Sequence, residues 1–191
     1  MKVLTLFASP RPAGNTAQLL APFMQTLREN GADVECVALY EKNIQPCLAC
    51  RSCQNTWEGF GCGQHDDAAE IFEKILESEL LVLATPIYAW YCTPPLKALL
   101  DRMVYGMNKY YGEEKGPSLW KGKRVALLTT CGYPVEKGAD LWEQGVKRYC
   151  KHSQLVYCGQ LAEHDPGYKE TFMDKEKAVR AGAFARKLLK N

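Results

Sequence analysis

The feature that most constrains the fold is a regular alternation of short apolar segments with amphipathic ones. Apolar, β-prone runs occupy residues 2–8, 33–39, 80–85, 124–130 and 155–161, and helical patterns occupy residues 15–30, 67–78, 93–105, 139–149 and 172–189. This alternation predicts an α/β fold with a parallel sheet covered by helices on both faces. Right-handed crossovers leave few topologies, and five strands fit the doubly wound order 2-1-3-4-5.

Length and composition limit the classes of function. The 191 residues fit one domain, 1–191, with a cysteine-rich insertion at about 40–66. A formal net charge of +2 gives no case for a nucleic-acid or membrane partner. The start, "MKVLTLFASPRP", ends in an arginine-bearing turn and not in a cleavage site, so we expect a first strand and no signal peptide. Nine cysteines then indicate a reducing compartment, and we expect a cytoplasmic protein.

Three helices show start signals. Asn15 followed by Gln18, and Asp67 followed by Glu70, have the spacing of a capping box. Thr93 precedes two prolines, which suit the first turn of a helix because their missing N–H groups cost little there.

The turn after the first strand, "SPRPAGNT", is rich in hydrogen-bond donors. Gly14 lies where backbone N–H groups and a helix N-terminus can face an anion. Arg11 adds a charged fork, and Ser9, Asn15 and Thr16 add neutral donors. The turn lacks the G-K-[ST] ending of a P-loop and the G-x-G-x-x-G of dinucleotide-binding folds, which speaks against ATP and a Rossmann domain. It predicts a phosphate site, and the alternative is a well-capped turn without a ligand.

Two further segments reach the carboxyl edge of the predicted sheet, where ligands bind in such folds. After the third strand comes an aromatic stretch that could form rigid walls for a flat ring, although its side chains could instead pack under the next helix. The predicted ring-binding residues there are Pro86, Ile87, Tyr88, Ala89 and Trp90. After the fourth strand, the small residues Thr130, Cys131 and Gly132 would let backbone approach a ligand closely.

The insertion carries a run of cysteines. Cys47, Cys50 and Cys53 form C-x2-C-x2-C, and Cys62 follows after eight residues. Two-residue spacings let successive thiolates converge on one metal centre, as in bacterial ferredoxins, so a [4Fe–4S] cluster is one interpretation. Free thiols are a second. A third is zinc, whose four-thiolate sites usually show two separated C-x2-C pairs.

The segments "ASPRPAGNT" and "DDAAEIFEKILESELLVLATPIYAWYCTPPLKALLDR" resemble motifs of the flavodoxin-like NAD(P)H-dependent FMN reductases over most of residues 1–102. "PCLACRSC" is similar to the iron–sulfur flavoprotein branch, although the gap before Cys62 is longer than the spacing of that branch. The resemblance implies a three-layer α/β/α fold, FMN phosphate on the first turn and isoalloxazine against the other two segments. Lys97, Asp101 and Arg102 match a family helix motif, and we expect a structural Lys97–Asp101 pair.

These observations predict an FMN-dependent oxidoreductase that moves electrons from NAD(P)H to a flavin, a quinone, another small acceptor or a redox protein. No catalytic side chain is predicted, because the cofactor carries the chemistry. An electron carrier with protein partners only, and a colourless regulatory module, remain as alternatives. The resemblance implies a homodimer or homotetramer. For the loop 106–122 we expect an oligomer contact that helps to cover the flavin, and the alternative is a solvated excursion.

Overall fold

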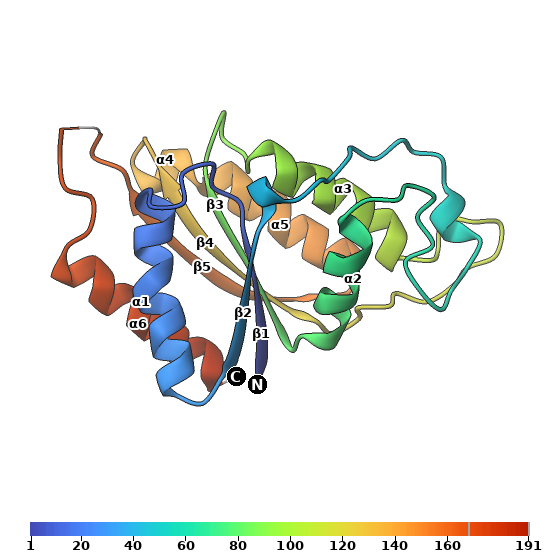
Figure 1. Cartoon of the computed structure of the whole chain (residues 1–191), viewed down its shortest axis with the longest axis horizontal. Coiled ribbons are helices and arrows are strands. Elements are labelled where there is room, and N and C mark those ends of the chain that lie inside the picture. Colours follow the sequence, from blue (N-terminus) through green and yellow to red (C-terminus); the bar gives the residue numbers. More distant parts are fainter. Residues whose placement is uncertain (168, 191) are drawn as a thin grey trace.

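A five-stranded parallel sheet forms the centre of the molecule, in a computed structural model that describes residues 1–167 and 169–190 (Figure 1). The strands run in the order β2-β1-β3-β4-β5, and each neighbouring pair is parallel. Their bounds are β1 Lys2–Phe7, β2 Asp33–Ala38, β3 Leu80–Pro86, β4 Arg124–Cys131 and β5 Val156–His164. The predicted fold class and strand order are confirmed.

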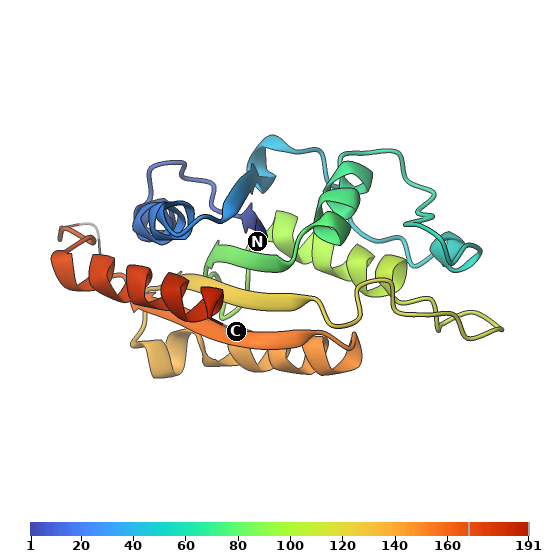
Figure 2. The same ribbon diagram turned by 90° about the horizontal axis from the view of Figure 1, so that it is seen from below.

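Helices cover both faces of the sheet (Figure 2). Helices α1 (Asn15–Glu29) and α6 (Lys175–Leu189) lie side by side on one face, whereas α2 (Ala68–Glu77), α3 (Pro94–Met107) and α5 (Asp140–His152) lie on the other. A hydrophobic core lies on each side of the sheet, and strand β1 contributes side chains to both. Val3 faces α1 and α6, whereas Leu4 faces the opposite helix layer. All seven residues of β3 are buried, as expected for a central strand covered on both faces.

The capping boxes predicted for the first two helices are wrong. Gly14 is the N-cap residue of α1, and the Gln18 side chain donates to a carbonyl outside the helix. At α2, Asp66 and not Asp67 accepts from the N–H of Ala68 at 3.1 Å. The Asp67 carboxylate instead accepts from the N–H of Asn43 at 2.7 Å, which ties it to the preceding loop.

The carboxy-terminal part differs most from its predicted bounds. A short helix, α4 (Val135–Gly138), precedes α5, and β5 runs to His164, three residues beyond its expected end. Helix α6 begins only at Lys175, while Phe172 is a buried anchor before it. No helix in the described ranges combines the length and apolar character that a membrane crossing requires.

Two long connections lie side by side at the carboxyl end of α3 (Figure 1). We call residues 39–67 the cysteine loop and residues 108–123 the long loop. The cysteine loop contains 3-10 turns at Leu39–Glu41 and Ser52–Gln54, and the long loop is anchored by the buried Trp120. Helix α3, which spans 14 residues or about 21 Å, separates this region from the carboxyl edge of the sheet near Thr93.

Candidate functional site

The three segments predicted at the carboxyl edge of the sheet meet around Gly132. One cavity of about 480 Å³ is lined by Arg11 and Asn15 from the first turn, by Gly132, and by the chain after β5. A second, of about 450 Å³, is lined by the turn after β3 and by residues after β4, again including Gly132. The crevice therefore has a donor-rich end and an aromatic end.

The donor-rich end is the amino terminus of α1. Its N-cap, Gly14, has no side chain to satisfy the first N–H groups, and no acidic residue lies in the first turn. A Cβ at Gly14 would lie 2.8 Å from the Arg11 Cβ, so the turn leaves no room for a larger residue. Free N–H groups, the positive end of the helix dipole and the exposed Arg11 guanidinium together suit a phosphate group.

Ser9 and Thr16 are turned inward. The buried Ser9 hydroxyl accepts from the N–H of Arg11 at 3.2 Å and so shapes the turn. The Thr16 hydroxyl lies 2.7 Å from that of Thr130, and both side chains are buried. This pair of hydroxyls joins α1 to β4, and the cofactor contacts of Thr16 and Thr130 stay a prediction.

The aromatic end is a strained turn. Tyr88 and Tyr91 exchange N–H···O=C bonds of 2.9 and 3.0 Å around Ala89 and Trp90. Both central residues have left-handed φ values, 48° for Ala89 and 63° for Trp90, in a turn type that favours Asn and Gly. Such strain costs of order 1–3 kcal/mol per residue and concentrates at functional sites. The turn projects the Tyr88 and Trp90 side chains into solvent, 47% and 46% exposed.

Trp90 is held from the far side of the crevice. Its Nε1 donates to the carbonyl of Lys137 at 3.1 Å, and its ring stacks on Tyr133 with centroids 5.8 Å apart. Tyr91 instead packs edge-on against the buried Trp142 of α5, so its ring is used for packing against that helix. The exposed pair of Trp90 and Tyr133 offers a flat apolar surface at the mouth of the cavity.

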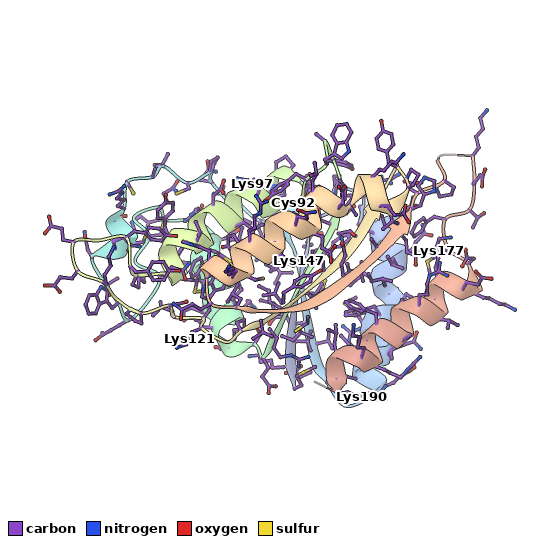
Figure 3. The ribbon with its side chains drawn as sticks, turned by 180° about the vertical axis from the view of Figure 1, so that it is seen from behind. Cys92, Lys97, Lys121, Lys147, Lys177 and Lys190 are labelled. Carbon is purple, nitrogen blue, oxygen red and sulfur yellow. The ribbon has the colours of Figure 1, made fainter. Side chains whose placement is uncertain are left out.

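The cysteines near this crevice are neutral packing groups. Burial raises the pKa of Cys131, whose Sγ donates to the carbonyl of Tyr133 at 3.2 Å. Burial raises the pKa of Cys92, just before α3, to about 12 (Figure 3). Neither thiol is prepared to act as a nucleophile at neutral pH.

Seven residues that line the two cavities were missed by the sequence analysis: Tyr133, Gly138, His164, Asp165, Pro166, Gly167 and Glu170. His164 and Asp165 reach the site because β5 extends to His164, and the N–H of Asp165 donates to the carbonyl of Cys131 at 2.7 Å. The signal that could have found them was the rule that ligands bind beyond the carboxyl ends of parallel strands.

Comparison with known proteins identifies the family of the chain. Residues 1–140 match the family model described as NADPH-dependent FMN reductase. The chain belongs to this family. It is 35% identical over 172 residues to an iron-sulfur flavoprotein of Archaeoglobus fulgidus, covering 81% of this chain and 77% of that protein. It is 34% identical over 102 residues to an iron-sulfur flavoprotein of Methanocaldococcus jannaschii, covering 53% of this chain and 51% of that protein.

A solved structure shows the same fold. The FMN-dependent NADH-azoreductase from Bacillus anthracis, crystallised in complex with FMN, superimposes with a TM-score of 0.71 at 16% identity. The superposition covers 98% of this chain and 99% of the azoreductase. The flavodoxin-like arrangement inferred from the resemblance is therefore confirmed for this member of the family.

The four cysteines of the insertion line a single small cavity, together with Arg102 and Tyr105. Burial raises the pKa of Cys53, whereas a hydrogen bond from the Ser52 hydroxyl lowers the pKa of the exposed Cys50. Within residues 1–167 and 169–190, no three cysteine, histidine or carboxylate side chains converge on one metal position. The cavity gathers the predicted ligands without showing them in a coordinating arrangement.

Arg102 ties this cavity to the rest of the fold. Its Nη1 lies 2.5 Å from the Asp66 carboxylate, with the two side chains only 1% and 2% exposed. Its Nη2 donates to the Cys62 Sγ at 3.2 Å. Burial by itself would raise the pKa of Asp66. Hydrogen bonds from Arg102 and from two backbone N–H groups outweigh this effect, and the net result is a lowered pKa. The neighbouring Lys97–Asp101 pair, 2.6 Å apart on the surface, forms as predicted.

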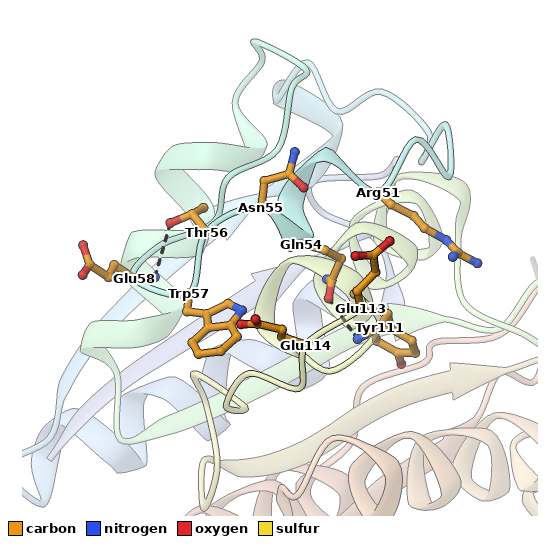
Figure 4. Close-up of a pocket in the computed structure, with 10 residues that line it drawn as sticks. Arg51, Gln54, Asn55, Thr56, Trp57, Glu58, Tyr111, Glu113 and Glu114 are labelled. Atoms are coloured by element: carbon orange, nitrogen blue, oxygen red, sulfur yellow. Dashed lines mark hydrogen bonds between the residues drawn. The ribbon is translucent and has the colours of Figure 1, made fainter.

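The cysteine loop and the long loop enclose a further cleft of about 710 Å³ (Figure 4). Trp57 and Glu58 line it from one side, and Tyr111 and Glu114 from the other. The Oε1 of Gln54 accepts from the N–H of Tyr111 at 3.0 Å, as Figure 4 shows. The long loop thus packs on the cysteine loop of its own chain and not over the flavin crevice.

Proposed function

We propose that the protein is an FMN-dependent oxidoreductase that takes electrons from NAD(P)H and passes them to a flavin, quinone or other small acceptor, or to a redox protein. The observation that carries this proposal is the pairing, across Gly132, of an uncapped helix terminus beside Arg11 with a strained aromatic turn at Ala89–Trp90. One end suits a phosphate and the other a flat ring, and the two cavities share Gly132, so one ligand could occupy both. Membership of the FMN reductase family supports the same cofactor.

The chain's own residues would bind the cofactor and orient it. Arg11, the N–H groups after Gly14 and the Asn15 side chain would hold the phosphate, and Ser9 and Thr16 would keep the turn in shape. The backbone of Pro86–Trp90 and of Thr130–Gly132 would lie along the ring system. When bound, FMN supplies hydride acceptance from the nicotinamide and electron delivery to the acceptor. No side chain at the crevice is needed as an acid or a base.

One spectroscopic experiment tests this proposal. Protein purified without oxygen should show the absorbance of bound flavin, and anaerobic NADPH or NADH should bleach it rapidly without any partner protein. Photochemically reduced protein provides the reference spectrum for full reduction. Flavin that is bound but not reduced by either nucleotide would support the carrier alternative, and a colourless protein would support a regulatory module.

We also propose that Cys47, Cys50, Cys53 and Cys62 hold a [4Fe–4S] cluster. The donor set fits, because four thiols line one cavity and Arg102 already donates to one of the sulfurs. The names of the two archaeal relatives point the same way. Zinc and free thiols remain the competing outcomes.

The cluster proposal has its own readout. Anaerobically reconstituted protein should be brown and contain about four irons per chain, the content of one cubane ligated by four thiolates. Cys50→Ser should lose the iron and keep FMN, whereas Cys92→Ser, which changes a buried thiol outside the cavity, should keep both. A yellow protein without iron or sulfide would leave a plain FMN reductase.

Assembly and location complete the proposal. We propose a homodimer or homotetramer in which the long loop, which lies away from the crevice of its own chain, contacts the partner subunit and helps to cover the partner's flavin crevice. We also propose a cytoplasmic location, which the nine free cysteines support because thiols stay reduced there. A monomeric mass at micromolar concentration, in protein that turns over NAD(P)H, would contradict the oligomer.

A further inference from the structure

Lys109, in the long loop, is a buried cation without an acidic partner. Its residue exposure is 0%, and its Nζ donates to the carbonyls of Cys53 at 2.8 Å and Phe60 at 3.0 Å. In the described part of the chain, no carboxylate forms an ion pair with it. Burial lowers its pKa, and the ionisable groups near enough to raise that pKa are the thiols of Cys53 and Cys62. Burying an ammonium group is costly unless an anion compensates it, so the uncompensated charge calls for an explanation.

The surroundings hold this ammonium in place. The Trp57 ring and the Lys109 stem both pack on Gly116, where a Cβ would lie 2.6 Å from the Trp57 Nε1 and 2.8 Å from the Lys109 Cβ. Gln54 adds a second clamp, since its Nε2 donates to the carbonyls of Tyr105 and Asn108 at 2.6 and 3.1 Å. The aliphatic stem and the head group are therefore fixed against the inner side of the cysteine loop.

Arg102 offers an instructive contrast. It also reaches the cysteine loop, but Asp66 neutralises its charge. Lys109 binds the same loop through the carbonyls of Cys53 and Phe60, and no carboxylate in the described residues pairs with it. Arg51 and Arg102 line the cysteine cavity itself, whereas Lys109 reaches it from behind, through the carbonyls of Cys53 and Phe60. An anionic occupant of the cavity would supply the counter-charge that Lys109 lacks.

We propose that Lys109 is a positioning residue of the iron–sulfur site: it fixes the 53–60 segment through two carbonyl oxygens and stabilises the negative charge of the cluster and its thiolates. This inference rests on the cluster proposed above. Reduction adds negative charge to the site, and a fixed cation nearby favours the reduced state, because net charge and hydrogen bonding set the potentials of such clusters. Lys109 is therefore expected to raise the reduction potential.

The test compares three variants of the reconstituted full-length protein. Lys109→Met removes the charge and both hydrogen bonds, and Lys109→Arg keeps a cation. Lys123→Met is the matched control, because Lys123 is a half-buried lysine that donates to the carbonyls of Leu76 and Ser78, away from the cysteines. Iron per chain and the midpoint of the reduced cluster's EPR signal are measured, and FMN content reports on folding.

We expect Lys109→Met to lose iron while keeping FMN, or to keep iron with reduction disfavoured at least tenfold, a drop of about 59 mV for a one-electron couple. Lys109→Arg should stay closer to the parent than Lys109→Met, and Lys123→Met should match the parent. If Lys109→Met also loses FMN, Lys109→Gln replaces it with the same expectation. A parent with four irons and a Lys109→Met variant with unchanged iron and midpoint would overturn the inference alone. A parent that takes up no iron would overturn the cluster proposal beneath it.

Discussion

The hydroxyl oxygens of Thr16 and Thr130 lie 2.7 Å apart in the interior of the protein, although 114 positions separate the two residues in the sequence. This contact joins the first turn of α1 to the end of β4, directly beneath the crevice. It fixes the distance between the turn proposed to bind phosphate and the segment proposed to approach the ring. The two threonines thereby shape the crevice from below.

Removing one of these hydroxyls should cost more than removing both. Thr130→Val leaves the buried Thr16 hydroxyl without its partner, which should lower the free energy of unfolding by about 1–3 kcal/mol. Thr16→Val with Thr130→Val replaces both polar groups by methyl groups and should recover most of that loss. Urea unfolding of the parent, both single variants and the double variant measures the coupling, and strictly additive losses would contradict it.

Arg11→Ala should weaken FMN binding by about 1.5–3 kcal/mol, the contribution of one charged hydrogen bond, or roughly tenfold or more in affinity. Quenching of flavin fluorescence during titration of the apoprotein measures the dissociation constant. Arg28→Ala, at the opposite end of α1, is the control and should bind FMN like the parent. Equal affinity in both variants would remove Arg11 from the phosphate site.

Trp90→Ala should lower FMN affinity by about 0.5–1.5 kcal/mol, the scale of one aromatic contact. The variant loses the indole bond to Lys137 and the stack on Tyr133. The same titration measures it, with Trp57→Ala as control, because Trp57 is similarly exposed, at 41%, but lies in the cysteine loop. If Trp57→Ala weakens FMN binding as much as Trp90→Ala does, the assignment of the aromatic turn is wrong.

Asp66→Asn should lower the free energy of unfolding at pH 7 by about 3–5 kcal/mol, because Arg102 would remain buried without its counter-ion. The folded-state pKa of Asp66 is depressed, so its stabilising contribution is present above its unfolded value, about 3.9, and is lost as the pH falls through the lower folded value. The difference between parent and variant should therefore shrink in acid below about pH 4.

Urea unfolding at several pH values follows this difference. Glu77→Gln is the control, since Glu77 pairs with Lys2 on the surface with its side chain 61% exposed, and such pairs contribute about 0–1 kcal/mol. A gap between parent and Asp66→Asn that stays constant into acid would show that the ionised pair is not its source.

Local sequence patterns predicted the sheet, because a strand that is buried on both faces consists of a continuous apolar run. The run "LLVLAT" is apolar throughout, and it became the central strand β3. Strand β5 lies at the sheet edge and mixes buried with half-buried residues, so its end at His164 left no comparable trace. His164 and Asp165 were consequently not expected at the crevice.

Contacts between distant residues could not be read from local patterns. A lysine in a polar loop is normally solvated, so nothing in the sequence marks Lys109 as buried. The Arg102–Asp66 pair joins positions 36 residues apart, and capping rules drew attention to Asp67 instead. For the crevice, the sequence predicted which segments come together. It could not predict that the Thr16 side chain points inward, because that orientation depends on Thr130, a partner on another element.

The clamp that Gln54 forms between the two loops also has a consequence for how the chain folds. Three hydrogen bonds of its side chain span more than 50 residues each, from the cysteine loop to Tyr105 at the end of α3 and to Asn108 and Tyr111 of the long loop. Neither loop contains an α-helix or a strand that could form first by local contacts. We therefore expect both loops to become ordered late and together, after the sheet has formed. Native-state hydrogen exchange would then report a single opening unit, in which the amides of both loops exchange at one common free energy, below that of the sheet.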